Sequence, residues 1–226
     1  MTLEKTIDVL GIGNAIIDVL ADADDAFLLQ HNLNKGSMTL VDEEASSNIY
    51  SSMKNKIQMS GGSAANTIYG LSQLGCRSAF IGKRSNDELG NIFYSDLTKS
   101  EIIFNTSPLD TGESSARCLI LVTSDAERTM ATFLGSSSKL TVEDINEEEI
   151  EAAKIIYLEG YLFDPPEAQE AFITAAEFAK KHNTKVSFTL SDAFCVERHK
   201  SKMRAFVQNN VDILFCNEGE VKALYE

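Results

Sequence analysis

The sequence predicts an α/β protein with a central, mostly parallel β-sheet, helices on both faces, and a small β-rich element. Three observations favour this class: strand-like and helical runs alternate from residue 141 onward, a short apolar run near the start ends in glycine, and two β-rich runs lie in the middle. Alternating strands and helices form parallel sheets, because each helix returns the chain to the same sheet edge. The 226 residues, 43% of them hydrophobic, suffice for one domain.

The elements of the first part follow from apolar periodicity and turn residues. In order, we expect a strand Ile7 to Ile12, an apolar stretch Ile16 to Ala21, a helix Ser63 to Leu74 and a strand Ser78 to Gly82. Gly13 and Asn14 follow the first strand directly, and Gly75 stands where a C-cap glycine ends the helix.

The second part begins with an expected antiparallel hairpin. Its strands are Ala116 to Thr123 and Arg128 to Leu134, joined by Ser-Asp-Ala-Glu. The alternating elements that follow are a helix opened by Thr141 with Asp144, strand Ile155 to Leu158, helix Pro166 to His182, strand Lys185 to Leu190, helix Val196 to Gln208 and strand Val211 to Cys216.

Charge and composition narrow the classes of partner and location. The formal net charge of −14 disfavours nucleic acid and anionic membranes, which need a basic face, and favours a small ligand held by local groups. The four cysteines form no CxxC pair, so neither a zinc site nor a disulfide framework is indicated. No signal peptide or run of about 18 apolar residues occurs, and we expect a cytoplasmic protein.

A small-residue loop, Ser60 to Asn66, is the strongest local signal for a ligand site. Gly61 and Gly62 permit close approach of a ligand to the backbone, and the following helix N-terminus offers free N–H groups and the amide of Asn66. By itself the glycine pair is also compatible with an ordinary turn before an N-capped helix.

Of two common nucleotide motifs, one is disfavoured and the other is excluded. The segment Gly11 to Ile16 begins like a dinucleotide fingerprint, but Ile16 replaces the final glycine or alanine, which disfavours an NAD-dependent oxidoreductase. Gly82-Lys83 is not a Walker A loop, because Arg84 stands where Ser or Thr should bind magnesium.

Ligands of open α/β sheets bind beyond the carboxyl ends of the strands, where this sequence reads GNAIID, EGYLFD, SDAF and NEGE. Asp18 is within reach of the same ligand as Asn14 if the chain leaves the strand in a loop, and its carboxylate suits paired sugar hydroxyls. Asn217 and Glu220 could hold water around Mg²⁺. The alternative readings are a turn residue for Asp18 and a capped helix N-terminus for Asn217 and Glu220.

Taken in this order, these pieces resemble the ribokinase (PfkB) family of carbohydrate and nucleoside kinases, especially its adenosine kinase branch, over essentially the whole chain. The residues that carry the resemblance are Gly13-Asn14 with Asp18, Gly61-Gly62 with Asn66, the run Gly82 to Gly90 containing Asn86-Asp87, the hairpin residues Glu127 to Met130, and Asn217 with Glu220. Ile68 and Ser85 depart from the family pattern without touching an implied contact.

The resemblance implies a ribokinase-like fold and a role for each matched residue. It implies that Asp18 accepts two substrate hydroxyls, that Asn14 and Asn66 hydrogen-bond the sugar, and that Gly61 and Gly62 let it approach. It further implies that Asn217 and Glu220 act on Mg²⁺ and the ATP phosphates. A discontinuous lid over the sugar is expected at about residues 15–41 and 112–135.

One family signature is absent from the sequence. The Gly-Ala-Gly-Asp loop, which supplies the anion hole and catalytic base in that family, occurs nowhere in it. We therefore expect residues 1–226 to be the N-terminal two-thirds of a single kinase domain whose ATP-binding and catalytic segment is missing. No catalytic residue is predicted in this chain, and turnover by it alone is not expected.

The function expected from the sequence is ATP-dependent phosphorylation of a primary hydroxyl on a nucleoside or sugar, with adenosine slightly preferred. Candidate aromatic walls for the base are Phe133, Tyr161, Phe163 and Phe194, although core or lid packing is the favoured explanation for all four. The alternatives are a ribokinase- or fructokinase-type sugar kinase and a non-catalytic nucleoside- or sugar-binding module. The lid hairpin could also pair with a second subunit as a homodimer.

Overall fold

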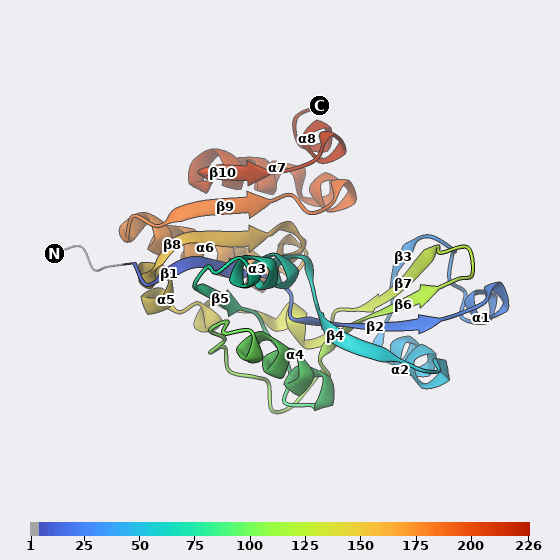
Figure 1. Cartoon of the computed structure of the whole chain (residues 1–226). Coiled ribbons are helices and arrows are strands. Elements are labelled where there is room, and N and C mark those ends of the chain that lie inside the picture. The colour runs from blue at the N-terminus through green and yellow to red at the C-terminus, as the bar shows by residue number, and fades with distance from the viewer. Residues whose placement is uncertain (1–4) are drawn as a thin grey trace.

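The computed structural model describes residues 5–226; residues 1–4, at the start of the segment in which no signal peptide is expected, lie outside the described residues. One sheet is parallel throughout, with the order β10-β9-β8-β1-β5. Its strands are β1 (Ile7–Ile12), β5 (Ser78–Ile81), β8 (Ala153–Glu159), β9 (Lys185–Thr189) and β10 (Ile213–Phe215). The predicted fold class is confirmed, and the carboxyl ends of β1, β8 and β9 point toward the second sheet (Figure 1).

Helices cover both faces of this parallel sheet. They are α3 (Ser63–Gln73), α4 (Glu88–Lys99), α5 (Glu147–Ala152), α6 (Pro166–Lys181), α7 (Ala193–Asn210) and α8 (Glu218–Tyr225). The face carrying α5, α6 and α7 buries one apolar core, in which Phe163, Phe172 and Phe188 pack edge to face or tilted. Within residues 5–226, no helix is both long and apolar enough to cross a bilayer.

The second sheet is mixed and has the order β3-β7-β6-β2-β4. Its strands are β2 (Ile16–Asp22), β3 (Met38–Leu40), β4 (Ile57–Gly61), β6 (Ala116–Val122) and β7 (Arg128–Phe133), and it carries the short helices α1 (Asp25–Gln30) and α2 (Glu43–Ser52) (Figure 1). The expected antiparallel hairpin is confirmed as β6 and β7. Strand β4 adds a segment outside the ranges 15–41 and 112–135 expected for the lid, and the assignment of this sheet as a lid stays a proposal.

A continuous apolar cluster joins the second sheet to the body. Phe80 of β5 and Phe93 of α4 belong to the same buried cluster as Val19 of β2 and Ile49 of α2. One face of the second sheet is therefore packed, and the alternate residues of each strand face the other way.

The helix expected to open at Thr141 is shorter and divided. Thr141 and Asp144 do form the expected capping box, but they cap only a 3₁₀ turn, Val142–Asp144. Asn146 then accepts hydrogen bonds from the N–H groups of Glu148 and Glu149 and starts α5 separately. The cap at Asn146 follows the cap at Thr141 so closely that the first turn ends before the second helix begins. The sequence pattern predicted one helix where the structure has these two elements. Two further 3₁₀ turns span Gly135–Lys139 and Gly160–Phe163.

Asp87 connects the body to the start of β6. Its Oδ1 accepts from the Gly90 N–H at 2.7 Å, which caps α4. Its Oδ2 accepts from the Ser115 N–H at 2.7 Å, one residue before β6 begins. The Ser85 N–H donates to the Ser115 hydroxyl at 3.0 Å and reinforces this junction. Asp87, from the Asn86-Asp87 pair singled out in the sequence, thus holds the backbone at the point where the chain enters β6.

We predict that Asp87→Ala lowers the free energy of unfolding by about 2–4 kcal/mol, because it removes a helix cap and leaves the Ser115 N–H without its acceptor. Urea denaturation measures this as a lower midpoint at constant slope. Asp42→Ala is the matched control, since Asp42 caps α2 at an exposed site through the Ala45 N–H alone, and about 1 kcal/mol is expected. Equal losses in the two variants would show that the Ser115 contact is unimportant.

Candidate active site

Asn14 is fixed at the carboxyl end of β1. Its side chain is 4% exposed, and its Nδ2 donates to Glu159 Oε1 at 3.0 Å. Glu159 is the last residue of β8, the strand next to β1 in the sheet. The adjacent Gly13 is confined, because a Cβ there would lie 2.5 Å from both Ala64 Cβ and Glu159 Oε2. The ends of β1 and β8 and the start of α3 therefore meet at one point.

Asp18 lies within β2, not in a loop after it. The chain leaves β1 through residues 13–15 and then enters β2, where the apolar residues Ile17 and Val19 alternate with Asp18; the alternative reading of Asp18 as a turn residue is wrong. The Asp18 carboxylate is half-buried and receives no hydrogen bond or ion pair from the residues that the structure describes. Burial raises the pKa of Asp18 from its ordinary value of 3.8 to about 6. A buried carboxylate that lacks partners indicates a functional site.

The glycine pair packs directly on these two residues. Gly61 is the last residue of β4, and a Cβ at Gly61 would overlap the carboxyl group of Asp18. Gly62 has φ +91° and is the N-cap of α3, and a Cβ there would lie 2.6 Å from the carbonyl oxygen of Asn14. Both positions need glycine: Gly61 because a side chain would not fit, and Gly62 for that reason and for its positive φ. The structure therefore brings Asn14, Asp18, Gly61 and Gly62 together.

Asn66 is linked to this group through the helix. Its backbone N–H donates to the Gly62 carbonyl at 2.9 Å, in the first turn of α3. Its side chain is exposed and forms no hydrogen bond with the described part of the chain. Its amide is thus available to a ligand, and contact of that amide with the same ligand as Asn14 and Asp18 stays a proposal.

Glu159 is the site residue that the sequence did not single out. It is 1% exposed, and its Oε2 accepts from the Ala64 N–H at 3.1 Å in the first turn of α3. Burial raises its pKa, and hydrogen bonds from Asn14, Ala64 and Ser63 oppose that rise. The signal was present in the segment EGYLFD after a predicted strand. Polar residues are common at strand ends, so position alone could not distinguish Glu159 from a turn residue.

Asn217 and Glu220 form a capping box at the start of α8. Asn217 Nδ2 donates to Glu220 Oε1 at 2.8 Å, the Asn217 N–H donates to Oε2 at 3.0 Å, and the Glu220 N–H donates to Asn217 Oδ1 at 2.9 Å. Each oxygen already accepts one bond, which fits water molecules around Mg²⁺ better than direct ligation. Among residues 5–226, no three His, Cys, Asp or Glu side chains cluster as a direct metal site.

The aromatic candidates fall into different environments. Phe163 is a core residue packed on Phe172 and Phe188, and Phe133 is buried against the guanidinium of Arg117 at 5.5 Å. Tyr161 is half-buried and donates to the Ser191 carbonyl at 3.4 Å. Phe194 is 72% exposed at the start of α7. Packing accounts for Phe163 and Phe133, and only Tyr161 and Phe194 keep surface for a ligand.

Lys83 also has a structural partner. Its ammonium forms an ion pair with Asp144 at 2.6 Å, and both side chains are largely buried. This pair fixes the 3₁₀ turn at Val142–Asp144 against the end of β5, which agrees with the exclusion of a Walker A loop.

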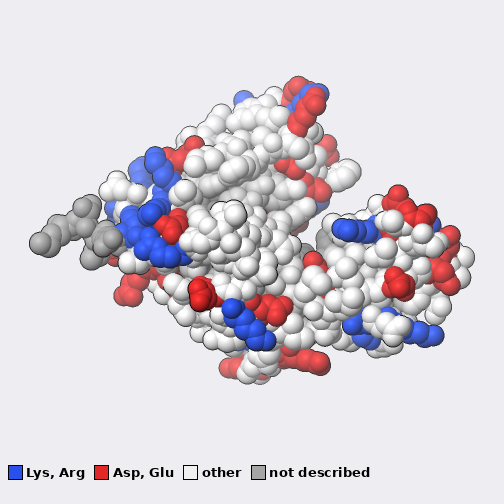
Figure 2. Space-filling view, viewed as in Figure 1, with Lys and Arg blue, Asp and Glu red and all other residues white. Residues whose placement is uncertain are grey.

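The open face of the second sheet presents apolar side chains around Asp18. Strand register places Asp18 in a row with Met59 of β4, and with Cys118 and then Thr132 on the other side. The next row consists of Ile57, Leu20, Ile120, Met130 and Met38. Ile57 is 60% exposed and Met59 43% exposed. Figure 2 shows a notch between the second sheet and the body. This face combines apolar surface with the carboxylate of Asp18, which has no partner among the described residues.

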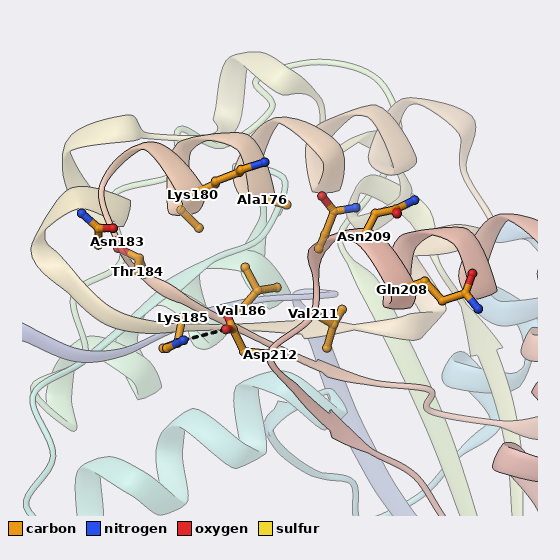
Figure 3. Close-up of a pocket in the computed structure, with 12 residues that line it drawn as sticks. Ala176, Lys180, Asn183, Thr184, Lys185, Val186, Gln208, Asn209, Val211 and Asp212 are labelled. Carbon is orange, nitrogen blue, oxygen red and sulfur yellow. Dashed lines mark hydrogen bonds and ion pairs between the residues drawn. The ribbon is translucent and has the colours of Figure 1, made fainter.

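A separate hollow of about 450 Å³ lies at the opposite, amino-terminal edge of the parallel sheet (Figure 3). It lies between the C-terminal ends of α6 and α7, with Lys180, Asn183 and Asn209 around it and the ion pair Lys185–Asp212 at 2.7 Å (Figure 3). The ammonium groups favour an anion, whereas two helix C-termini disfavour one. Because it lies at the amino-terminal edge of the sheet, the hollow is remote from Asn14 and Asp18. The charges around it favour neither an anionic nor a cationic ligand.

Comparisons with known proteins agree on one family. Residues 41–226 match the pfkB family carbohydrate kinase description. Guanosine-inosine kinase of Escherichia coli (strain K12) is 31% identical, over 96% of this chain and 52% of the relative. The crystal structure of adenosine kinase from Sinorhizobium meliloti superposes with a TM-score of 0.88 at 43% identity, over 97% of this chain and 67% of that one. A probable sugar kinase protein from Rhizobium etli CFN 42 gives 0.89 at 39% identity, over 98% and 67%. The chain spans about half the length of the curated relatives it matches.

Proposed function

This chain belongs to the pfkB family of carbohydrate kinases, and from that premise we propose that it carries the acceptor site of an ATP-dependent kinase. The acceptor is a nucleoside or sugar whose primary hydroxyl receives the γ-phosphoryl group, with adenosine slightly preferred. The observation that carries the proposal is Asp18, a half-buried carboxylate that packs on Gly61 and has no hydrogen-bond or ion-pair partner among residues 5–226. A vicinal diol can donate two hydrogen bonds to such a carboxylate.

Each residue of the site then has a definite task. Asp18 accepts from two ring hydroxyls, Asn14 Oδ1 and the Asn66 amide hydrogen-bond the sugar, and the absence of a Cβ at Gly61 and Gly62 lets the sugar approach the backbone. The second sheet, as a lid, excludes water from the transferred group. ATP supplies the phosphoryl group and Mg²⁺ offsets its charge, with Asn217 and Glu220 holding water of that ion.

The open face of the second sheet supports a nucleoside over a free sugar. The exposed apolar residues Met59 and Ile57 lie beside Asp18 on strand β4, and Leu40 lies at the other end of the Asp18 row, on β3. Such apolar surface suits an aromatic base better than a polyol. The same face could instead cover a second copy of the chain, which is the proposed homodimer. Light scattering distinguishes the two, since a base-binding face leaves the chain monomeric and a dimer face does not.

Calorimetric titration with adenosine, guanosine, inosine, D-ribose and D-fructose tests the proposed acceptor. We expect purine nucleosides to bind and the free sugars to bind more weakly. Binding of fructose or ribose in the absence of nucleoside binding would favour the sugar kinase alternative, which the similarity to a probable sugar kinase protein keeps open.

We also predict that the 226 residues alone show no steady phosphorylation of adenosine. The Gly-Ala-Gly-Asp sequence expected to supply the base and anion hole does not occur in them. Loss of a general base costs about 10²- to 10⁴-fold in rate, and loss of the anion hole a comparable factor. ADP release in a coupled assay measures this. Nucleoside binding with no turnover agrees with the prediction and also with a non-catalytic binding module, whereas steady turnover contradicts it.

The proposed location is the cytoplasm, where free thiols such as the four in this chain persist.

A further inference from the structure

Glu159 is a buried carboxylate without a cation. Its side chain is 1% exposed, and it takes part in none of the ion pairs formed by the described residues. An apolar residue would fill this position between β1, β8 and α3 at lower cost, because a buried carboxylate must be compensated by hydrogen bonds. We therefore expect the Glu159 carboxylate to have a role beside Asn14 that an apolar side chain could not have.

The task follows from what its two oxygens accept. Oε1 accepts from Asn14 Nδ2 at 3.0 Å, and Oε2 accepts from the Ala64 N–H at 3.1 Å. Hydrogen bonds from Ala64 and Ser63 favour the ionised form of Glu159 against the effect of burial on its pKa. An ionised carboxylate only accepts, so it can pair with the NH₂ group of an amide and never with its oxygen. The orientation of the Asn14 amide is consequently set, with Nδ2 toward Glu159 and Oδ1 on the other side. No group in residues 5–226 donates to that Oδ1.

We infer that Glu159 is a positioning residue of the acceptor site, which fixes the Asn14 amide so that Oδ1 accepts a hydroxyl of the bound nucleoside or sugar. The inference rests on the proposed function, because it assigns the free Oδ1 to the acceptor. Glu159 itself touches no substrate, since its oxygens are engaged with Asn14 and Ala64. Through Ala64 it also holds the start of α3, and with it the glycine pair, in place.

The substitution Glu159→Gln separates positioning from packing. The introduced glutamine has the same shape as the glutamate but carries one acceptor and one donor. The glutamine oxygen still accepts the hydrogen bond from the Ala64 N–H, and its NH₂ group then needs an acceptor. The Asn14 amide therefore rotates by half a turn, so that Oδ1 faces the glutamine and Nδ2 faces the ligand. We expect Glu159→Gln to keep the fold and to weaken adenosine binding roughly 10- to 30-fold, because a hydroxyl donor then meets a donor.

The double variant Asn14→Asp with Glu159→Gln supplies the rescue. The introduced aspartate accepts from the introduced glutamine with one carboxylate oxygen and offers the other oxygen to the ligand, so affinity should return to within about threefold of the wild type. If Glu159 served packing alone, affinity in Glu159→Gln would be unchanged, a result that overturns the inference. A loss that Asn14→Asp does not restore, at an unchanged unfolding midpoint, also overturns it.

The wild-type arm separates the two proposals. Titration with adenosine, inosine and D-fructose identifies the ligand used; if none binds the wild type, the proposed function fails and this inference with it. If Glu159→Gln does not fold, proton exchange of the Asn14 side-chain amide in the wild type decides. One Nδ2 proton protected by Glu159 supports the inference, and equally fast exchange of both protons overturns it.

Discussion

Asp18→Asn is expected to weaken adenosine binding about 30- to 150-fold while leaving the fold intact. The loss corresponds to about 2–3 kcal/mol for charge-assisted hydrogen bonds from the ribose diol to the carboxylate. Asparagine has the same shape, so the packing against Gly61 is kept. Calorimetric titration at pH 8 measures the change. A variant that binds as tightly as the wild type would remove Asp18 from the acceptor site.

The same variant should not be less stable than the wild type. Burial raises the pKa of Asp18 to about 6, so the folded state holds this proton more tightly than the unfolded chain does. The free energy of unfolding contributed by Asp18 is therefore present below about pH 4 and is lost as the pH rises to about 6. At pH 8, Asp18→Asn removes an unfavourable buried charge. Loss of binding without loss of stability is the pattern of a residue retained for function.

Ligand affinity should have the opposite pH dependence. The diol donates to the ionised carboxylate, so affinity is highest above about pH 6 and falls as Asp18 takes up its proton below that. In Asp18→Asn this decline disappears. Titrations between pH 5 and 8 measure the dependence, and an equal decline in both proteins would assign it to another group.

Gly61→Ala is the second substitution with a large expected effect. The added Cβ overlaps the Asp18 carboxyl group, so either the carboxylate turns away or β2 and β4 separate. We expect a loss of about 1–3 kcal/mol in the free energy of unfolding and of adenosine affinity by tenfold or more. Thermal unfolding and calorimetric titration measure the two effects.

Gly70→Ala is the matched control for that substitution. Gly70 lies inside α3, and a Cβ there meets nothing within 4 Å. Alanine exceeds glycine in helix propensity by about 1 kcal/mol, so this variant should be slightly more stable and bind adenosine unchanged. Similar losses in both variants would mean that Gly61 has no special contact.

The sequence predicted the body of the fold better than the second sheet. Strand Ile7–Ile12 has the predicted bounds, and the strands and helices from residue 153 onward lie within a few residues of those expected, because long apolar runs and turn residues mark them. Helix α2 reads EEASSNIYSS and was not predicted, since its serines and asparagine are weak helix formers. Strand β4 is short and carries exposed apolar residues, which hid its pairing with β2.

The sequence predicted those site residues that stand at the ends of recognisable strands and helices. The glycine pair and Asn14 were recognisable from their positions at element ends, and the family resemblance expected from them is confirmed. Glu159 could not be selected, because its role depends on a contact with Asn14 across 145 positions of sequence. The capping box of Asn217 and Glu220 matched both the magnesium hypothesis and the helix N-terminus hypothesis from the sequence, and the structure shows the second geometry without testing the first.

The coupling between Asp18 and the ligand hydroxyls tests the account most directly. Adenosine and 2′,3′-dideoxyadenosine are titrated into the wild type and into Asp18→Asn, and the four affinities give one coupling energy. We expect removal of the diol to weaken binding to the wild type at least about 30-fold and binding to Asp18→Asn less than about threefold. An equal loss in both proteins would contradict it, because the carboxylate would then hold no ribose hydroxyl.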